Sequence, residues 1–271
     1  MNEIKNIQKF ANEIRSIAVT LAHNVNESHS GGALSMADLL AVIYTKYIGV
    51  AAIKENRSDR DRFILSKGHC CATLYAALAK VGILSEKELF RSFAQDGTYY
   101  FAHASHMLPG VELSTGSLGH GLPVACGMAI GAKRAGSNTK VYCVVGDGEM
   151  DEGSNWEAIM FAAHHKLDNL YLIIDKNQMQ ALGNTKDVLS LDPLPCKLET
   201  FNWEVVEIDG NNVEQIVSAF EYLNTCTSGK PKVIVANTIK GKGVSYMENN
   251  LRFHYSAPNE LELKQALEEL I

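Results

Sequence analysis

Residues 141–149 read VYCVVGDGE, a short apolar run that leads directly into a glycine-rich acidic turn. A run of this length and composition is typical of a strand that is buried on both faces of a sheet. Thirty positions after Asp147, Asn177 follows a second apolar run at residues 170–174, and residues 155–165 between them have helical spacing. This order predicts a βαβ unit whose two strands are parallel neighbours.

The polar residues Asp147 and Asn177 follow the two predicted strands at their carboxyl ends. Parallel α/β sheets bind ligands in the crevice beyond those ends. Mg²⁺ prefers carboxylate, carbonyl, water and phosphate oxygens, and glycines beside Asp147 let the backbone approach a diphosphate closely. We therefore expect a magnesium and diphosphate site here. The main alternative is a dinucleotide-binding turn, but its G-x-G-x-x-G fingerprint requires a third glycine that this sequence lacks.

The rest of the chain continues the alternation of strand and helix signals. Further apolar runs lie at residues 63–65, 205–206 and 233–236, and helical spacing occurs at residues 4–21, 35–47, 71–81 and 260–271. The order predicts an α/β fold with a mostly parallel sheet and helices on both faces. Because the sequence has no repeat and no low-complexity linker, we expect residues 1–271 to form a single domain.

Charge and composition exclude several classes of partner. The net charge of -6 argues against a general affinity for nucleic acid or for an anionic membrane. Charged residues interrupt the apolar positions of residues 1–22, so we expect neither a signal peptide nor a membrane span, and we expect a cytoplasmic protein. The six cysteines have no CxxC spacing, which favours reduced, buried thiols; they are Cys70, Cys71, Cys126, Cys143, Cys196 and Cys226.

Several segments resemble those of a known family, and they occur in the family's order. Residues 28–32 read SHSGG, residues 65–69 read LSKGH and residues 110–121 read GVELSTGSLGHG. They are similar to the GHPGG, LSxGH and GVxxxTGxLGxG segments of transketolases. The GDG turn with its later Asn resembles the thiamine-diphosphate motif of the same enzymes. With KGKGV at residues 240–244 and HYSAPN at residues 254–259, the resemblance extends from about residue 10 to residue 265.

The resemblance implies a thiamine-diphosphate-binding (PP-type) fold, with thiamine diphosphate and Mg²⁺ as cofactors, and transfer of a two-carbon ketol unit from a ketose to an aldose. Histidine suits this chemistry because it titrates near neutral pH and can donate or accept a proton. The implied catalytic residues are His29, His69, His103 and His254. The implied cofactor-binding residues are His69, Gly116, Ser117, Leu118, Gly146, Asp147, Gly148, Glu149, Asn177 and His254. The implied metal ligands are Asp147, Asn177 and the carbonyl of Met179.

Some positions stay open or depart from the family pattern. A short gap in a variable loop leaves His106 as an alternative to His103, and the role of His254 stays open. His120 replaces the usual Gln, and Ser28 and Ser30 replace the usual Gly and Pro. These departures leave the identity of the sugar undecided. We expect structural roles for the histidines on predicted helices, which are His23, His164 and His165.

The resemblance also implies a residue that this sequence does not supply. In transketolases the glutamate that activates the aminopyrimidine lies on a second, pyrimidine-binding domain, whereas only a loop and a charged helix follow residue 236 here. We therefore expect a partner, a C-terminal transketolase subunit, in a heterotetramer that acts on sugars or sugar phosphates. Two alternatives are the α subunit of a 2-oxo acid dehydrogenase, which normally lacks LSxGH and TGxLGxG, and a non-catalytic cofactor-binding scaffold, which retention of Asp147 and Asn177 disfavours.

Overall fold

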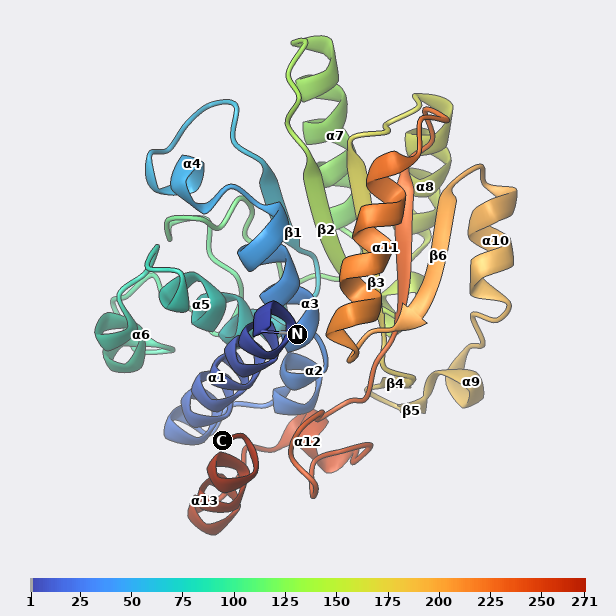
Figure 1. The fold of residues 1–271 in the computed structure, drawn as a ribbon. Coiled ribbons are helices and arrows are strands. Elements are labelled where there is room, and N and C mark those ends of the chain that lie inside the picture. Colours follow the sequence, from blue (N-terminus) through green and yellow to red (C-terminus); the bar gives the residue numbers. More distant parts are fainter. Residues whose placement is uncertain (1) are drawn as a thin grey trace.

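The computed structural model describes residues 2–271, and a five-stranded parallel sheet forms its centre (Figure 1). The strand order is β1-β2-β3-β7-β6, and every neighbouring pair is parallel. The strands are β1 (Arg62–Leu65), β2 (Val141–Gly146), β3 (Leu170–Lys176), β6 (Glu204–Asp209) and β7 (Lys232–Asn237). Each contains one of the five predicted apolar runs, and the predicted α/β class with a mostly parallel sheet is confirmed.

Helices cover both faces of the sheet, as predicted, because buried strands have two apolar faces. Alternate residues of β2 enter different cores: Tyr142 and Val144 pack on one face, and Val141, Cys143 and Val145 pack on the other. The first core contains helices α1 (Asn2–Val25), α3 (Ala37–Val42), α5 (Cys71–Lys80) and α11 (Val213–Thr225). The second contains α7 (Gly121–Arg134), α8 (Gly153–His164) and α10 (Leu194–Thr200).

The predicted helix over residues 35–47 is present over most of its length, but it begins two residues later and changes to a π-helix part-way. The segment is divided: α2 (Ser30–Ser35) ends before Met36, α3 follows, and Ile43–Tyr47 forms a π-helix, η1. At the boundary between α2 and α3, the hydroxyl of Ser35 donates to Asp175 Oδ2 at 2.6 Å and fixes the end of α2 against β3. Apolar spacing alone carries no signal of this polar anchor.

The remaining elements are short, apart from the C-terminal helix. They are α4 (Val50–Lys54), η2 (Gly68–Cys70), α6 (Glu86–Ser92), η3 (Gly148–Asp151), β4 (Met179–Gln180), β5 (Gly183–Asn184), α9 (Thr185–Val188), α12 (Arg252–Tyr255) and α13 (Glu260–Glu269). The antiparallel pair β4 and β5 was not predicted, because two-residue strands have no detectable period. Within residues 2–271, no helix has both the length and the apolar character needed to cross a membrane.

All six cysteines are free thiols, as predicted. The prediction that they are buried holds for four of them, but it was wrong for Cys196, which is exposed, and for Cys226, which is partly exposed. Both lie near helix ends on the outer layer, Cys196 within α10 and Cys226 directly after α11.

Candidate active site

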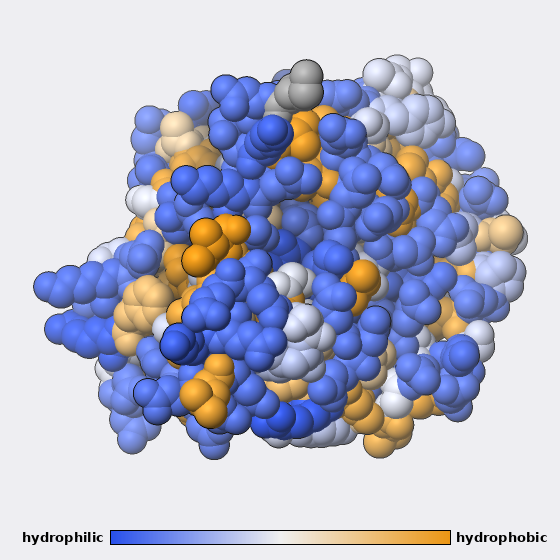
Figure 2. Space-filling view, turned by 60° about the horizontal axis from the view of Figure 1, so that its bottom comes forward, coloured by the Kyte–Doolittle hydropathy of each residue, from blue (hydrophilic) through white to orange (hydrophobic). Residues whose placement is uncertain are grey.

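The carboxyl ends of β2 and β3 bring Asp147 and Asn177 to one edge of the sheet. The register pairs Gly146 with Asp175, so Asp147 and Asn177 lie at nearly the same height along their two neighbouring strands. Both side chains are buried, and together with Met179 they line a cavity of about 310 Å³. Figure 2 views the molecule with this end turned forward, where hydrophilic residues cover most of the surface between separate hydrophobic patches.

Backbone N–H groups hold the carboxylate of Asp147. Its Oδ1 accepts from the N–H of Gly148 at 2.8 Å, and its Oδ2 accepts from the N–H of Gln178 at 2.5 Å. Burial, followed by the charge of Asp175, raises the pKa of Asp147 to about 6. A cation beside this carboxylate would stabilise its charged form, so the site is suited to bind a metal ion.

The predicted metal ligands are hard oxygen atoms, and the protein supplies only a few of them. In the described part of the chain, no group of three or more His, Cys, Asp or Glu side chains could hold a metal ion. Asp147, the Asn177 amide and the Met179 carbonyl would leave positions for phosphate and water, which is the usual arrangement for Mg²⁺. The Asn177 oxygen now accepts from the N–H of Met179 at 3.2 Å, and the Met179 carbonyl accepts from Lys240 at 3.1 Å.

Close packing explains the glycine of the GDG turn. A Cβ at Gly148 would lie 2.8 Å from Cβ of Gln180, and a Cβ at Gly116 would lie 3.3 Å from a ring carbon of His103. Both glycines line the cavity. Their backbone therefore stays accessible to a ligand in a way that a side chain would prevent, which fits a diphosphate.

Glu149 connects three loops around the cavity. Its carboxylate accepts the N–H of Gly119 at 3.0 Å, the N–H of Gly146 at 3.1 Å and the hydroxyl of Ser66. Burial raises its pKa. Glu149 lines the cavity, but its oxygens are already engaged by the protein, so direct cofactor binding by this residue stays a prediction.

Three of the predicted histidines form a cluster in the cavity. The ring of His29 lies 4.8 Å from that of His69 and 5.1 Å from that of His254, centroid to centroid. Burial, with further contributions from nearby Lys and His, lowers their pKa values, to about 4 for His29, about 2 for His69 and about 3 for His254. The rings are therefore neutral near pH 7, and each has one N–H donor and one acceptor nitrogen.

A strained backbone presents His29 to the cavity. Its φ of 70° and ψ of 10° lie in the left-handed region, which is uncommon for a residue with a side chain. Its N–H donates to the carbonyl of His254 at 3.1 Å, and its Nδ1 lies 2.7 Å from the hydroxyl of Ser28. Ser28, one of the departures from the family pattern, thus holds the ring directly.

His103 and its alternative, His106, lie in different surroundings. His103 lines the cavity, with a ring carbon 3.3 Å from the place that a Cβ at Gly116 would occupy. His106 does not line the cavity, and its Nδ1 lies 2.8 Å from the hydroxyl of Ser114. The geometry favours His103. Among the other residues of this region, Leu118 lines the cavity and Ser117 is exposed outside it. His120 is also exposed, with Nδ1 3.0 Å from the carbonyl of Leu118.

The histidines with expected structural roles lie outside the cavity lining. On α1, His23 Nδ1 is 2.9 Å from the carbonyl of Pro258. His164 is exposed, and the ring of His165 packs against Phe161 with centroids 4.2 Å apart. These positions agree with the expectation for all three.

Two buried lysines in the cavity wall were not predicted from the sequence. Lys67 forms an ion pair with Asp175 at 2.5 Å and donates to the carbonyl of Gly32 at 3.0 Å. Burial alone would lower the pKa of Lys67, but Asp175 raises it above its usual value. Burial and then Lys67 lower the pKa of Lys240 to about 8. Lys67 lies in the LSKGH segment and Lys240 in the KGKGV segment. The presence of a lysine in a segment shared with the family was the only indication in the sequence that it belongs to the site.

A cavity with two ammonium groups, oxygen ligands at strand ends and accessible glycine backbone fits a diphosphate with its metal ion. Comparison with known proteins agrees, since the family described as "Transketolase, thiamine diphosphate binding domain" matches residues 6–270. The chain belongs to this family. The resemblance found in the sequence is thereby confirmed over nearly the whole chain.

Relatives in this family differ in length. The chain is 43% identical to an apulose-4-phosphate transketolase subunit of Actinobacillus succinogenes, covering 97% of this chain and 95% of the relative. It is 39% identical to the 6-deoxy-6-sulfo-D-fructose transketolase subunit SqwG of Clostridium sp., covering 97% and 96%. The solved transketolase of Leishmania mexicana superposes with a TM-score of 0.89 at 30% identity. The matched region includes 97% of this chain but only 41% of the larger protein. This chain thus matches less than half of a full-length transketolase but nearly all of each of these two separate subunits.

Proposed function

We propose that this chain is the cofactor-binding subunit of a two-subunit transketolase, which transfers a two-carbon ketol unit from a ketose to an aldose with thiamine diphosphate and Mg²⁺. The observation that carries the proposal is one cavity that contains both Asp147 with Asn177 and a cluster of neutral histidines. The first pair suits a metal-bound diphosphate, and the histidines suit hydroxyl groups and their protons.

Each part of the cavity has a role in this proposal. Asp147, Asn177 and the Met179 carbonyl hold Mg²⁺, and the backbone of Gly116 and Leu118 holds the aminopyrimidine. When bound, thiamine diphosphate supplies the carbon nucleophile for the ketose carbonyl. His29, His69 and His103 bind substrate hydroxyls and move their protons, because a neutral imidazole can donate through one nitrogen and accept through the other.

A partner protein completes the site in this proposal. The chain corresponds to 41% of a full-length transketolase, and two relatives of about its own length are named as transketolase subunits. We infer that residues 1–271 are one diphosphate-binding domain and that a C-terminal transketolase subunit supplies the pyrimidine-binding domain with the activating glutamate. Two copies of each would form a heterotetramer, which we place in the cytoplasm.

The substrate is proposed from the names of the relatives. Apulose 4-phosphate and 6-deoxy-6-sulfo-D-fructose, which appear in two of those names, are sugars with an anionic group. We propose a ketose of this kind, with a ketose phosphate first among candidates, as the donor. A screen of ketose donors and aldose acceptors on the reconstituted complex would identify the pair.

The proposal is tested by a two-carbon transfer assay with and without the partner subunit, at matched thiamine diphosphate and Mg²⁺. We expect no ketol transfer by this chain alone and turnover once the C-terminal subunit is added, because half of the site cannot activate the cofactor. Turnover by the chain alone would refute the two-subunit proposal. Absence of turnover with every donor and acceptor, despite cofactor binding by the complex, would refute the reaction.

A further inference from the structure

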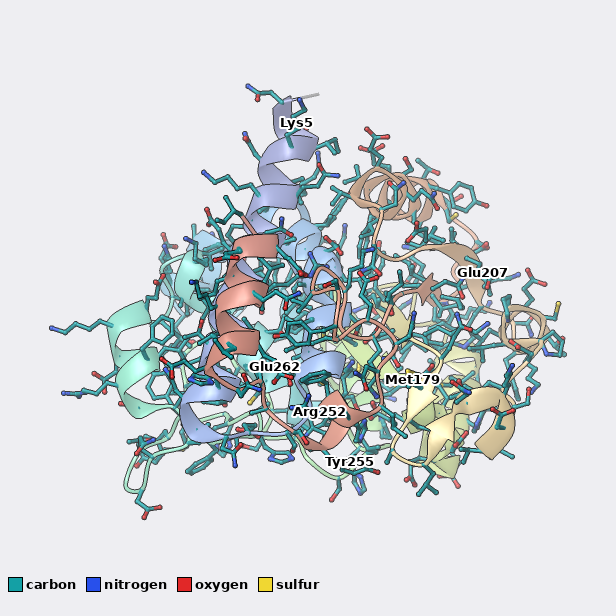
Figure 3. All side chains as sticks on the ribbon, turned by 90° about the horizontal axis from the view of Figure 1, so that it is seen from below. Lys5, Met179, Glu207, Arg252, Tyr255 and Glu262 are labelled. Atoms are coloured by element: carbon teal, nitrogen blue, oxygen red, sulfur yellow. The ribbon has the colours of Figure 1, made fainter. Side chains whose placement is uncertain are left out.

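Lys240 joins two parts of the cavity wall that are far apart in sequence. Its Nζ donates to the carbonyl of Met179, in the short strand β4, at 3.1 Å and lies 2.8 Å from Nδ1 of His254, in α12. Only 2% of the lysine is exposed. Figure 3, seen from below, labels Met179 near Tyr255, the neighbour of His254, and the Tyr255 hydroxyl donates to the carbonyl of Ala181, two residues after Met179.

The chemistry of these contacts decides which nitrogen of His254 carries the proton. An ammonium group has three N–H donors and no acceptor, so it can only donate to its partners. The Met179 carbonyl accepts one of these N–H groups, and Nδ1 of His254 must accept another with its lone pair. In a neutral imidazole the single proton is then on Nε2.

We propose that Lys240 is a positioning residue that fixes His254 as the tautomer protonated on Nε2, so that His254 offers the cavity an N–H donor and no proton acceptor. His254 lines the cavity, and its Nε2 has no hydrogen-bond partner within residues 2–271. This nitrogen is therefore available to a ligand in the cavity and is not used to hold the fold.

The surroundings of the ring support one fixed orientation. The His254 ring meets that of His29 edge to face, at 5.1 Å and 72°, and the ring of Tyr255 at 4.9 Å. The carbonyl of His254 accepts the N–H of His29 at 3.1 Å. The hydroxyl of Tyr255 donates to the carbonyl of Ala181 at 2.5 Å, which ties α12 to the same segment that Lys240 reaches at Met179. Rotation of the ring would break the Lys240 contact and disturb this packing.

The consequence for the reaction rests on the proposed function. A donor nitrogen can stabilise an oxygen of the diphosphate or of the ketose, but it cannot accept a substrate proton. Within the cluster, proton acceptance is then left to His29 and His69, with His103 beside them. His254 thereby differs in role from the other three histidines, although sequence motifs place all four in one class.

The test is a long-range ¹H–¹⁵N correlation spectrum of the 271-residue chain labelled with ¹⁵N-histidine, near pH 7, where the coupling pattern distinguishes the two tautomers. His254 is assigned by the signals lost in His254→Gln. We expect the Nε2-protonated pattern in the unaltered chain. A signal from the Nδ1-protonated tautomer would overturn the proposal, and this measurement needs no substitution of Lys240.

Substitutions then test whether Lys240 is the cause. Lys240→Arg should keep the single tautomer, since a guanidinium also only donates, whereas Lys240→Met should give a mixture of both. Lys242→Met is the matched control, because Lys242 lies on the same loop and pairs with Glu248 outside the cavity lining. An unchanged single tautomer in Lys240→Met, in a chain whose circular dichroism shows it folded, would overturn the assignment to Lys240.

The readout separates this inference from the proposed function. The tautomer is observed in the chain without cofactor, substrate or partner, so failure of ketol transfer in the complex would leave the spectrum interpretable. In an active complex, we expect Lys240→Met to lower kcat/KM about tenfold or more and Lys240→Arg to recover part of it. Equal loss in both variants would contradict a role through donor geometry.

Discussion

The cavity has two parts that differ in how the fold places them. The strand-end part, Asp147 and Asn177, follows two neighbouring parallel strands, so sheet register alone brings the residues together. The loop-borne part consists of the histidines and of Lys240, which come from segments as distant in sequence as His29 and His254. The strand-end part therefore depends on secondary structure, whereas the loop-borne part depends on tertiary contacts that could each be lost separately.

Asp175 connects the two parts. It lies on β3, two residues before Asn177, and its fully buried carboxylate accepts from Lys67, Ser35 and Thr238. Three segments are thus fixed to one strand: the end of α2, the turn that carries His69, and the segment that leads to Lys240. The comparison predicts that damage to the strand-end part abolishes cofactor binding, while damage to the loop-borne part affects stability or turnover.

The largest effect is expected for Asp147→Ala. This change removes the anionic metal ligand, so we expect no detectable binding of thiamine diphosphate and Mg²⁺ to the complex with its partner, measured by calorimetric titration. Asp168→Ala is the control, because Asp168 precedes β3 at the opposite end of the sheet and forms an exposed ion pair with Lys133. Wild-type affinity in Asp147→Ala would refute the metal assignment.

The second effect is a loss of stability in Lys67→Met. The change leaves the buried Asp175 carboxylate without its cation, and breaking such a pair typically costs about 3–5 kcal/mol of unfolding free energy. Urea unfolding followed by circular dichroism measures it. Lys80→Met, which removes a partly exposed pair with Glu13, should cost no more than about 1 kcal/mol. Similar losses in both variants would mean that Asp175 does not depend on Lys67.

The same division explains what the sequence could predict. Five strands and the edge that carries Asp147 and Asn177 follow from apolar runs and from the geometry of parallel sheets. The histidines came from the family resemblance, because no period links His29 with His254. Neither source identified the Lys67–Asp175 pair or the contacts of Lys240, since a buried charge leaves no mark in a pattern of apolar residues. The contact of Ser35 with Asp175 at the end of α2 was missed for the same reason.

The third effect concerns turnover. If His69 and His103 act on the substrate, alanine at either position should lower kcat by about 100-fold or more while cofactor affinity changes much less. His164→Ala, at an exposed position on α8, should have little effect. Steady-state kinetics and cofactor titration of the three complexes measure the difference. Equal kinetics in all three would show that His69 and His103 have structural roles.

The smallest effect is a dependence of stability on pH. The folded chain holds His69 neutral because burial, and then Lys67, lower its pKa to about 2, whereas an unfolded histidine has a pKa of about 6.5. Below pH 6.5 the unfolded state therefore binds a proton that the folded state excludes, so stability falls as the pH falls. Between pH 7.5 and pH 5.0 this difference amounts to about 2 kcal/mol.

A comparison of variants isolates the contribution of His69 from that of other titrating groups. Asp147, with its raised pKa, acts with the opposite sign, since the folded state binds its proton more readily, but it contributes equally to wild type and His69→Gln. We expect urea unfolding of His69→Gln to lose about 2 kcal/mol less than wild type between pH 7.5 and pH 5.0. His164→Gln, exposed on α8, should keep the wild-type slope. If His69→Gln also kept that slope, His69 would titrate normally in the folded chain, and the loop-borne part of the site would be more open to water than its packing indicates.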